Sequence, residues 1–298
     1  MIKLIASDMD GTLLNNDHDI DKETVDAIRK AEEAGIIFAI STGREYDSVK
    51  GILEKHNIKA QCVLSNGAEY RDEDGNILEV VNIKKENAKK ILEILDKNKL
   101  SARIFTDRGV FTISTREEAF QEVIFRIMTF NPSLTEDEAR KVAKDQAFFT
   151  DLQYIEDIDK FFESGVEVRK FVAFHKDIEF IDKMKKVIGE IEGLAISSSF
   201  RDNIEITDIN AQKGIILEKV AKNMSIATED VMILGDSFND YSMFEIFEET
   251  VAMKNAIPEV KAIAKYITDS NDKLGVAKAI YNVINDEMYK MIKVKESC

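Results

Sequence analysis

The sequence predicts an α/β protein in which a doubly wound parallel sheet carries a second, α+β domain as an insertion. Two observations lead to this class. Short apolar runs alternate with amphipathic helical stretches in the first and last parts of the 298-residue chain. Between residues 83 and 193 this alternation stops, and 12 of the 17 phenylalanines fall there, enough for a separate core. We therefore expect a core domain over residues 1–82 and 194–298, and an inserted domain over 83–193.

The first part of the chain has the pattern strand, helix, strand, helix, strand. Apolar runs predict the strands, and apolar side chains repeating about every 3.6 residues predict the helices. Parallel strands need a long crossover connection, which is usually a helix. The alternation of strands and helices therefore indicates a parallel sheet. The expected strands are Ile2–Ser7, Ile36–Ile40 and Cys62–Leu64, and the expected helices are Lys22–Ala34 and Tyr46–His56.

The same pattern is expected to resume after the insertion. The insertion itself shows mixed helical and alternating patterns, for example over Ala102–Ile113 and Glu167–Phe174. Ligands of open parallel sheets bind at the carboxyl ends of the strands, so polar residues that follow strands are the candidates for a site. The expected later elements are strands near Asn203–Thr207, Val231–Leu234, Ala252–Met253 and Tyr266–Thr268, a helix over Lys213–Asn223 and a last helix from Gly275.

Composition limits the possible partners and the compartment. The formal charge of −15 argues against a nucleic-acid partner, which would require a basic face, and leaves small molecules. Cys62 and Cys298 are the only cysteines and lie far apart, which fits a reducing compartment. The N-terminal residues reach a charged motif too early for a signal peptide, and no apolar stretch approaches membrane-spanning length. We expect a cytoplasmic protein without a membrane partner, as a monomer or small homo-oligomer.

Two acidic residues, Asp8 and Asp10, directly follow the first expected strand. Residues two apart in an extended segment point the same way, and Gly11 permits a close backbone approach. Such a pair suits a nucleophile and a general acid/base beside a hard cation. An EF-hand is excluded, because a loop starting at Asp8 would need glycine where Leu13 stands and glutamate where Asp19 stands. A solvated acidic turn is the alternative for this motif alone.

A candidate phosphate-binding turn, formed by Ser41, Thr42, Gly43 and Arg44, lies between the second strand and a helix. A strand-to-helix turn with free backbone N–H groups receives a phosphate well. Thr42 offers a hydroxyl, Gly43 an unobstructed N–H and Arg44 a planar fork for oxygen anions. The alternative for the turn alone is a plain helix N-cap by Ser41 or Thr42.

Two further motifs lie in the last part of the chain. Lys213 is the first residue of an expected helix, where its positive charge is unfavourable beside the positive end of the helix dipole. The position makes more sense if an anion lies opposite the lysine. The alternative is a lysine that faces solvent. Asp236 and Asp240 follow the strand Val231–Leu234, and Gly235 frees the turn. Mg²⁺ takes oxygen ligands, so one carboxylate from each acidic loop and a backbone carbonyl would hold it. An acidic turn is the alternative here.

In this order and at strand ends, the four motifs resemble those of the haloacid dehalogenase-like phosphatases of class IIB, the Cof-type group, many of which are sugar phosphatases. The resemblance extends to the inserted segment, where that group carries its cap domain. It implies a Rossmann-like core and a Mg²⁺-dependent phosphatase of small phosphorylated metabolites, with sugar phosphates as the favoured substrate class. The similar segments also include Ser65–Ala68, Met253–Ala256 and Tyr266–Asn271.

The resemblance also implies roles for the charged residues. Asp8 matches the nucleophile that forms an aspartyl-phosphate, and Asp10 matches the acid/base that protonates the leaving oxygen and then activates water. Lys213 matches the lysine that neutralises the nucleophile and the phosphate. Asp236 matches the metal carboxylate, which acts with Asp8 and the main-chain carbonyl of Asp10. Asp240 matches a position that supports the metal ligands.

For the phosphate, the resemblance implies binding by the Ser41–Arg44 turn, with Thr42 as the phosphate-binding hydroxyl and Asn239 as a supporting residue. Two departures from the family pattern are mild. Phe238 stands where the family often has Glu or Ala, and Ala211-Gln212 replaces a frequent Gly-Val pair. Neither position holds a catalytic side chain, so the departures concern the substrate pocket.

Three other functions are weighed against the phosphatase. A phosphomutase would return the phosphoryl group to a sugar, and release of inorganic phosphate without a bisphosphate activator separates the two. A receiver-like signalling module combines similar residues, but it needs its phospho-acceptor on a later strand and no large insertion. A catalytically inactive binding protein should have lost at least one charged residue of the site, and the sequence keeps them all.

Overall fold

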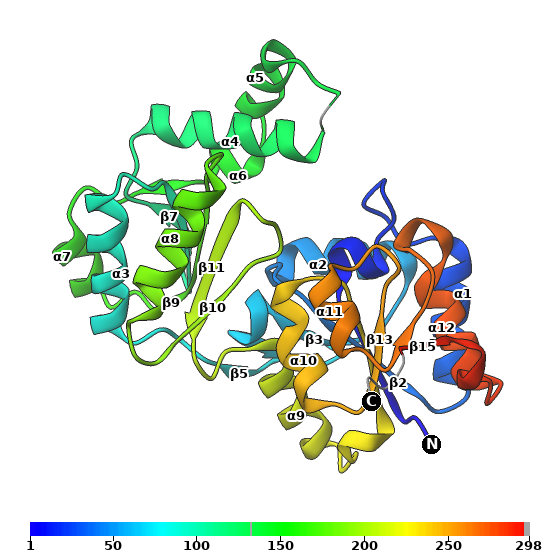
Figure 1. The fold of residues 1–298 in the computed structure, drawn as a ribbon. Helices are drawn as coiled ribbons and strands as arrows, with labels where there is room; N and C mark the ends of the chain where they lie inside the picture. Colours follow the sequence, from blue (N-terminus) through cyan, green and yellow to red (C-terminus); the bar gives the residue numbers. More distant parts are fainter. Residues whose placement is uncertain (132, 295–298) are drawn as a thin grey trace. The chain divides into compact units, whose positions relative to one another are not determined.

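The computed structural model describes residues 1–131 and 133–294, and the chain forms two compact units. The first unit comprises Met1–Val81 with Asn210–Cys298, and the second comprises Asn82–Ile209. The first unit contains a largely parallel sheet with helices on both faces, which confirms the predicted fold class. The second unit combines a mostly antiparallel sheet with helices (Figure 1).

The sheet of the first unit has nine strands among the described residues, in the order β15-β14-β13-β12-β1-β2-β3-β4-β5. The six strands from β14 to β3 run parallel, while β4, β5 and β15 are antiparallel additions at the two edges. The bounds are β1 Leu4–Ser7, β2 Ile37–Ser41, β3 Gln61–Leu64, β4 Glu69–Arg71, β5 Ile77–Val80, β12 Val231–Gly235, β13 Glu249–Ala252, β14 Tyr266–Ile267 and β15 Ile292–Lys293.

The central position of β1 determines where the site forms. Leu4 pairs with Val231 of β12 on one side and with Ile37 of β2 on the other. Every residue of β1 and β12 is buried, as expected for strands that are covered on both faces. The loops that follow β1, β2 and β12 therefore meet at one edge of the sheet.

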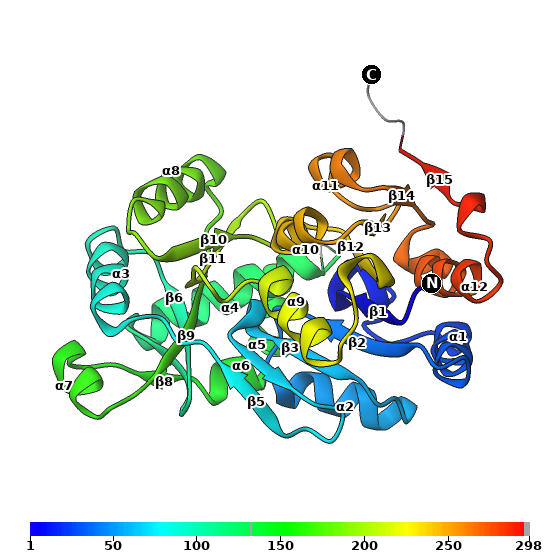
Figure 2. The same ribbon diagram turned by 90° about the horizontal axis from the view of Figure 1, so that it is seen from below.

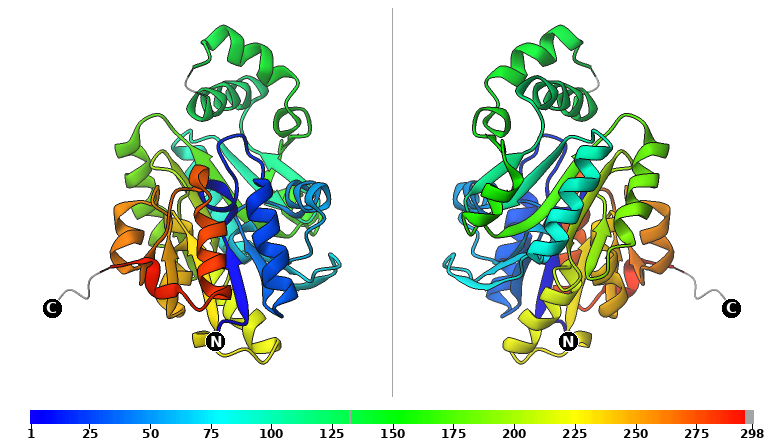
Figure 3. Two further views of the ribbon diagram at one scale, coloured as in Figure 1. Left: turned by 90° about the vertical axis from the view of Figure 1, so that its right-hand side faces the viewer. Right: turned by 90° about the vertical axis from the view of Figure 1, so that its left-hand side faces the viewer.

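Helices cover both faces of this sheet. α1 packs beside α12 on one face, as Figure 3 shows, and α9, α10 and α11 follow one another on the other face (Figure 2). The predicted helices Tyr46–His56 and Lys213–Asn223 have the predicted bounds. The bounds are α1 Lys22–Glu33, α2 Tyr46–His56, α9 Lys213–Asn223, α10 Tyr241–Ile246, α11 Pro258–Ile263 and α12 Gly275–Ile284.

The second unit is built on a six-stranded sheet in the order β10-β11-β9-β6-β7-β8. Its pairs are antiparallel except for β7 with β8. The helices α3 and α8 share a core with one face of this sheet, centred on Phe171. The strands are β6 Ala102–Thr106, β7 Gly109–Thr112, β8 Gln153–Tyr154, β9 Val168–Phe174, β10 Leu194–Ser197 and β11 Asn203–Asp208.

The remaining helices of the second unit include a packed pair, α4 with α5 (Figure 1). Each begins with a capping box, in which Thr115 or Thr135 exchanges hydrogen bonds with a glutamate three residues later. The helices are α3 Lys85–Lys97, α4 Arg116–Phe130, α5 Glu136–Lys144, α6 Ala147–Thr150, α7 Ile158–Glu163 and α8 Ile178–Gly189.

The structure corrects the sequence prediction for Asn203–Thr207. This segment is β11, and it pairs antiparallel with β9 and β10 in the second sheet instead of joining the parallel sheet. Ile204 and Ile206 are buried in the core of the second unit, which holds the strand there. The second unit consequently continues to Ile209, beyond the joint expected near Gly193.

Cys62 lies buried in β3, and burial raises the pKa of its thiol to about 12. A thiol with so high a pKa stays protonated at neutral pH and reacts slowly. Cys298 lies outside the described residues. Within residues 1–131 and 133–294, we find no helix that combines the length and the apolar character needed to cross a membrane.

Candidate active site

Asp8 sits at the carboxyl end of β1, where its N–H donates to the carbonyl of Leu234 at 3.0 Å. The chain then forms a wide helical turn over Met9–Leu13. Gly11 in this turn has φ +79°, and a Cβ there would lie 2.6 Å from Oδ2 of Asp236. Only glycine fits at this position without strain, because the two acidic loops approach each other here.

Lys213, at the start of α9, lies between two carboxylates. Its Nζ is 2.6 Å from Oδ1 of Asp8 and 2.6 Å from Oδ1 of Asp240, and the residue is only 1% exposed. Burial pulls the pKa of this ammonium down, but the two carboxylates together raise it above its ordinary value. The lysine is therefore charged, and the anions expected opposite the helix terminus are Asp8 and Asp240.

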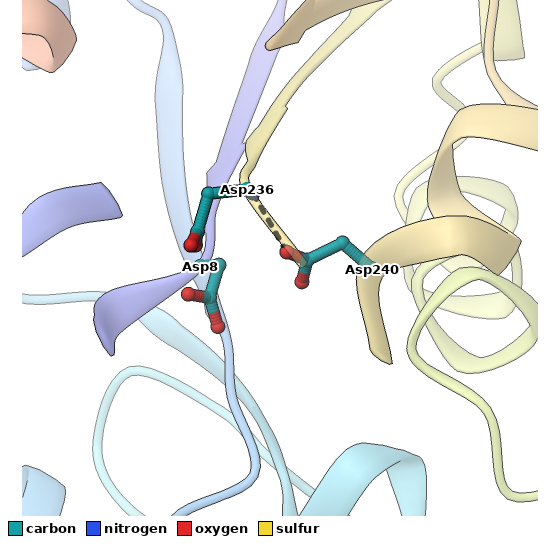
Figure 4. Close-up of side chains that lie close together, drawn as sticks. All are labelled: Asp8, Asp236 and Asp240. Atoms are coloured by element: carbon teal, nitrogen blue, oxygen red, sulfur yellow. Dashed lines mark hydrogen bonds between the residues drawn. The ribbon is translucent and has the colours of Figure 1, made fainter. Parts of the chain in front are cut away.

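Asp240 organises the second acidic loop. Its Oδ2 accepts the N–H groups of Asp236 at 2.9 Å and Ser237 at 3.0 Å; Figure 4 shows the bond to Asp236. Asp236 in turn accepts a hydrogen bond from the hydroxyl of Thr12 at 2.9 Å. Both oxygens of Asp240 are thus engaged, while Asp8 and Asp236 each keep one oxygen outside these hydrogen bonds.

The carboxylates of Asp8, Asp236 and Asp240 form an acidic cluster (Figure 4), with one oxygen of each within 4.8 Å of the others. Burial raises the pKa of Asp8 well above its ordinary value, against the effect of Lys213. Burial and the charge of Asp240 raise the pKa of Asp236 to about 7. Three carboxylates that share one lysine keep a net negative charge and offer only oxygen ligands, which suits a hard divalent cation.

The phosphate-binding turn differs from the prediction in its amides. The N–H of Thr42 continues the sheet by donating to the carbonyl of Val63 at 2.8 Å, and the N–H of Arg44 donates to Oγ1 of Thr42 at 3.2 Å. These two N–H groups are therefore not free for a phosphate, because strand pairing engages the first and the Thr42 side chain engages the second. Ser41 and Thr42 are fully buried, and α2 starts only at Tyr46.

Arg44 meets Asp10 across this turn. The guanidinium donates from Nε to Oδ2 of Asp10 at 2.8 Å and from Nη2 to Oδ1 at 2.6 Å. Both side chains are partly exposed, 26% for Arg44 and 42% for Asp10. The structure thus brings together a predicted phosphate-binding residue and the predicted acid/base.

Asn239 and three further asparagines, Asn66, Asn255 and Asn271, connect the loops around the acidic cluster. Asn239 donates to Oδ1 of Asn66 at 3.4 Å, which connects it to the loop after β3. Asn255 donates to the carbonyl of Gly11 at 2.7 Å and accepts the N–H of Asn271 at 3.1 Å. Asn66, Asn255 and Asn271 lie in segments that resemble the family, but the sequence does not show their partners, which come from distant loops. Asn255 holds the turn that carries Asp10, through the carbonyl of Gly11.

Comparisons with known proteins identify the family of the chain. The family model of the haloacid dehalogenase-like hydrolases matches residues 5–280. Phosphatase YwpJ of Bacillus subtilis is 32% identical over 285 residues, covering 95% of this chain and all of the relative. The 5-amino-6-(5-phospho-D-ribitylamino)uracil phosphatase YwtE of the same organism is 31% identical, covering 96% and 99%. A solved haloacid dehalogenase-like hydrolase from B. subtilis superposes with a TM-score of 0.83 at 31% identity, covering 95% and 100%.

Fold and site define an α/β enzyme that works with carboxylates at the ends of parallel strands. The chain belongs to the haloacid dehalogenase-like hydrolases. Within this family it is a phosphatase, like the relatives YwpJ and YwtE.

Proposed function

We propose that the chain is a Mg²⁺-dependent phosphatase that hydrolyses phosphate monoesters of small metabolites through an aspartyl-phosphate on Asp8. Sugar phosphates are the favoured substrate class. One observation carries the proposal: buried Lys213 bridges Asp8 and Asp240, while Asp236 lies beside them. This arrangement gives a nucleophilic carboxylate, fixed positive charge and a second carboxylate for a cation in one place. Phosphoryl transfer depends mostly on such positioning and charge neutralisation.

In the first half-reaction, a carboxylate oxygen of Asp8 attacks phosphorus and the bond to the leaving oxygen breaks. Asp10 gives its proton to that oxygen, so the product leaves as an alcohol. Lys213 stays charged beside Asp8 and neutralises the phosphoryl oxygens. In the second half-reaction, Asp10 takes a proton from water, which attacks the phosphorus and restores the carboxylate of Asp8.

Asp8, Asp236 and the main-chain carbonyl of Asp10 are the proposed Mg²⁺ ligands. The choice of Asp8 and Asp236 over Asp240 rests on the hydrogen bonds, since both oxygens of Asp240 are already engaged. Asp240 then orients Lys213 and the backbone after β12. When bound, Mg²⁺ would neutralise the carboxylates and the phosphate and so lower the barrier to nucleophilic attack.

The substrate class is supported by the relatives. YwtE is named for a substrate with a phosphorylated ribityl chain, a phosphate monoester of a polyol. The second unit, Asn82–Ile209, would act as the cap that selects among such substrates. A panel of sugar phosphates, polyol phosphates, nucleotides and coenzyme phosphates tests the proposal. We expect release of inorganic phosphate from a small monoester without any bisphosphate activator; transfer of the phosphoryl group to a second sugar position would instead indicate a phosphomutase.

Asp10→Asn is expected to lower kcat by about 10²–10⁴-fold for alkyl phosphates, the usual contribution of a general acid. The loss should be smaller for the release of nitrophenolate from p-nitrophenyl phosphate, since this leaving group needs little protonation. Burst kinetics on both substrates measure this first step apart from the attack of water, which Asp10 also assists. Equal slowing of the first step for the two leaving groups would assign the proton to another residue.

Mg²⁺ is expected to raise the Tm of the protein more at about pH 8 than at about pH 5. Burial raises the pKa of Asp236 to about 7 in the folded protein, above its ordinary value. The free energy of unfolding therefore falls as the pH rises from about 4 to about 7, because the folded protein must give up a proton that it binds more tightly than the unfolded chain does. At the higher pH the cation binds an ionised carboxylate, whereas at the lower pH it must displace a proton. Asp236→Asn should remove most of this difference. An unchanged Mg²⁺ effect in that variant would place the metal elsewhere.

A further inference from the structure

Arg44 and Asp10 form a contact that the reaction sequence above does not use. Both oxygens of Asp10 accept hydrogen bonds from Arg44, at 2.6 and 2.8 Å. Two parallel bonds between a guanidinium and a carboxylate fix the orientation of both groups. The residue that must protonate the leaving oxygen is therefore held by a cation, with both of its oxygens engaged.

The main chain on each side of this pair is fixed independently. The N–H of Arg44 donates to the hydroxyl oxygen of Thr42, and the carbonyl of Arg44 accepts the N–H of Ser65 at 2.9 Å. On the other side, the carbonyl after Asp10, that of Gly11, accepts from Asn255. The two side chains can therefore separate and re-form their contact without movement of either loop.

The energetics favour exchange of partners. The two side chains are 26% and 42% exposed, so water reaches the ion pair and screens the attraction between its charges. A phosphate monoester carries up to two negative charges and presents several oxygens, so the fork of Arg44 binds it at least as well as one carboxylate. A phosphate that arrives beside Asp8 would displace Asp10 from Arg44.

We propose that Arg44 is a positioning residue for Asp10, which it holds through both carboxylate oxygens and releases when substrate phosphate takes over its guanidinium. The inference rests on the proposed phosphatase function. Once released, Asp10 is placed to give a proton to the leaving oxygen as the bond to phosphorus breaks and to take one from the attacking water, as in the two half-reactions above.

A double-mutant cycle tests this kinetically. Arg44→Ala should slow phosphoenzyme formation from glycerol phosphate by about 10²-fold, the cost of a misplaced catalytic group, and should slow the nitrophenolate burst from p-nitrophenyl phosphate much less. In an Asp10→Asn background, Arg44→Ala should add little further loss of kcat. Arg44→Lys keeps the charge but not the fork, so it should restore KM more than kcat. Arg29→Ala, which removes an exposed arginine from α1, is the matched control.

Two results together would overturn the inference: Arg44→Ala lowers activity equally on the two substrates, and its effect multiplies with that of Asp10→Asn. Arg44 would then be a simple phosphate ligand. Calorimetry with inorganic phosphate and Mg²⁺ gives a readout without turnover. Asp10→Ala should tighten phosphate binding in the protein that keeps Arg44, because Asp10 no longer competes for the guanidinium. The same substitution should tighten phosphate binding less in the Arg44→Ala background. Equal tightening in both backgrounds, in a protein that binds phosphate and turns over, contradicts the inference alone. A wild-type protein that neither binds phosphate nor hydrolyses any monoester contradicts the proposed function, and the inference with it.

Discussion

Asp8→Asn is expected to lower phosphate release by roughly 10⁴-fold or more, the scale of losing a catalytic nucleophile. An amide keeps the shape of the side chain, but it is neither a nucleophile nor an anionic metal ligand. Steady-state kinetics on a nitrophenyl ester, with protein expressed in a host that lacks competing phosphatases, measures the loss. Asp17→Asn makes the same chemical change on an exposed carboxylate and should keep wild-type activity.

The same variant should remain folded. Burial raises the pKa of Asp8, which means that the ionised side chain is held in the site at a cost to stability. A neutral amide avoids this cost, and Asp240 still pairs with Lys213. The Tm of Asp8→Asn should therefore equal or exceed that of the wild type. A clearly lower Tm would show that Asp8 serves the fold as well as the reaction.

Lys213→Met is expected to lower the free energy of unfolding by about 3–5 kcal/mol, because it leaves two buried carboxylates without their cation. Urea unfolding without metal measures this effect. Lys219→Met is the matched control on the same helix. Its side chain is 44% exposed and its partner, Glu79, is also at the surface, so the expected cost is about 0–1 kcal/mol.

A second variant separates charge from packing at this position. Asp240→Asn added to Lys213→Met removes one of the uncompensated carboxylates and should recover part of the lost stability. Equal stabilities of Lys213→Met and Lys219→Met would contradict the account, since the lysine would then contribute nothing to the buried cluster. Activity should be lost in both Lys213 variants, because no fixed cation remains beside Asp8.

Local patterns predicted much of the core. The apolar spacing of Lys213–Asn223 and Tyr46–His56 gave the observed helix bounds, and the runs before Asp8 and Asp236 are adjacent parallel strands. The rule that parallel strands present their carboxyl ends at one edge then brought the acidic loops together. β11 was misplaced because apolar alternation indicates a strand but not its neighbours, which are decided by packing in the second unit.

Contacts between distant loops were beyond sequence reasoning. Asp10 and Arg44 are each recognisable, but only the register of β1 against β2 places a carboxylate within reach of that guanidinium. Asn255 depends likewise on a loop at the opposite end of the chain. The amides of the Ser41–Arg44 turn were predicted to be free because the pattern shows a turn and does not show the strand pairing that continues through Thr42.

The central claim, that Asp8 carries the phosphoryl group, is tested most directly by trapping the intermediate. Asp10→Asn should accumulate it, because formation with a nitrophenyl ester needs no acid while the attack of water has lost its base. Rapid acid quench and peptide mass spectrometry should then find one phosphoryl group on the peptide that contains Asp8, and none in Asp8→Asn. A burst of nitrophenolate without that modified peptide, or with the phosphoryl group on another residue, would contradict the account.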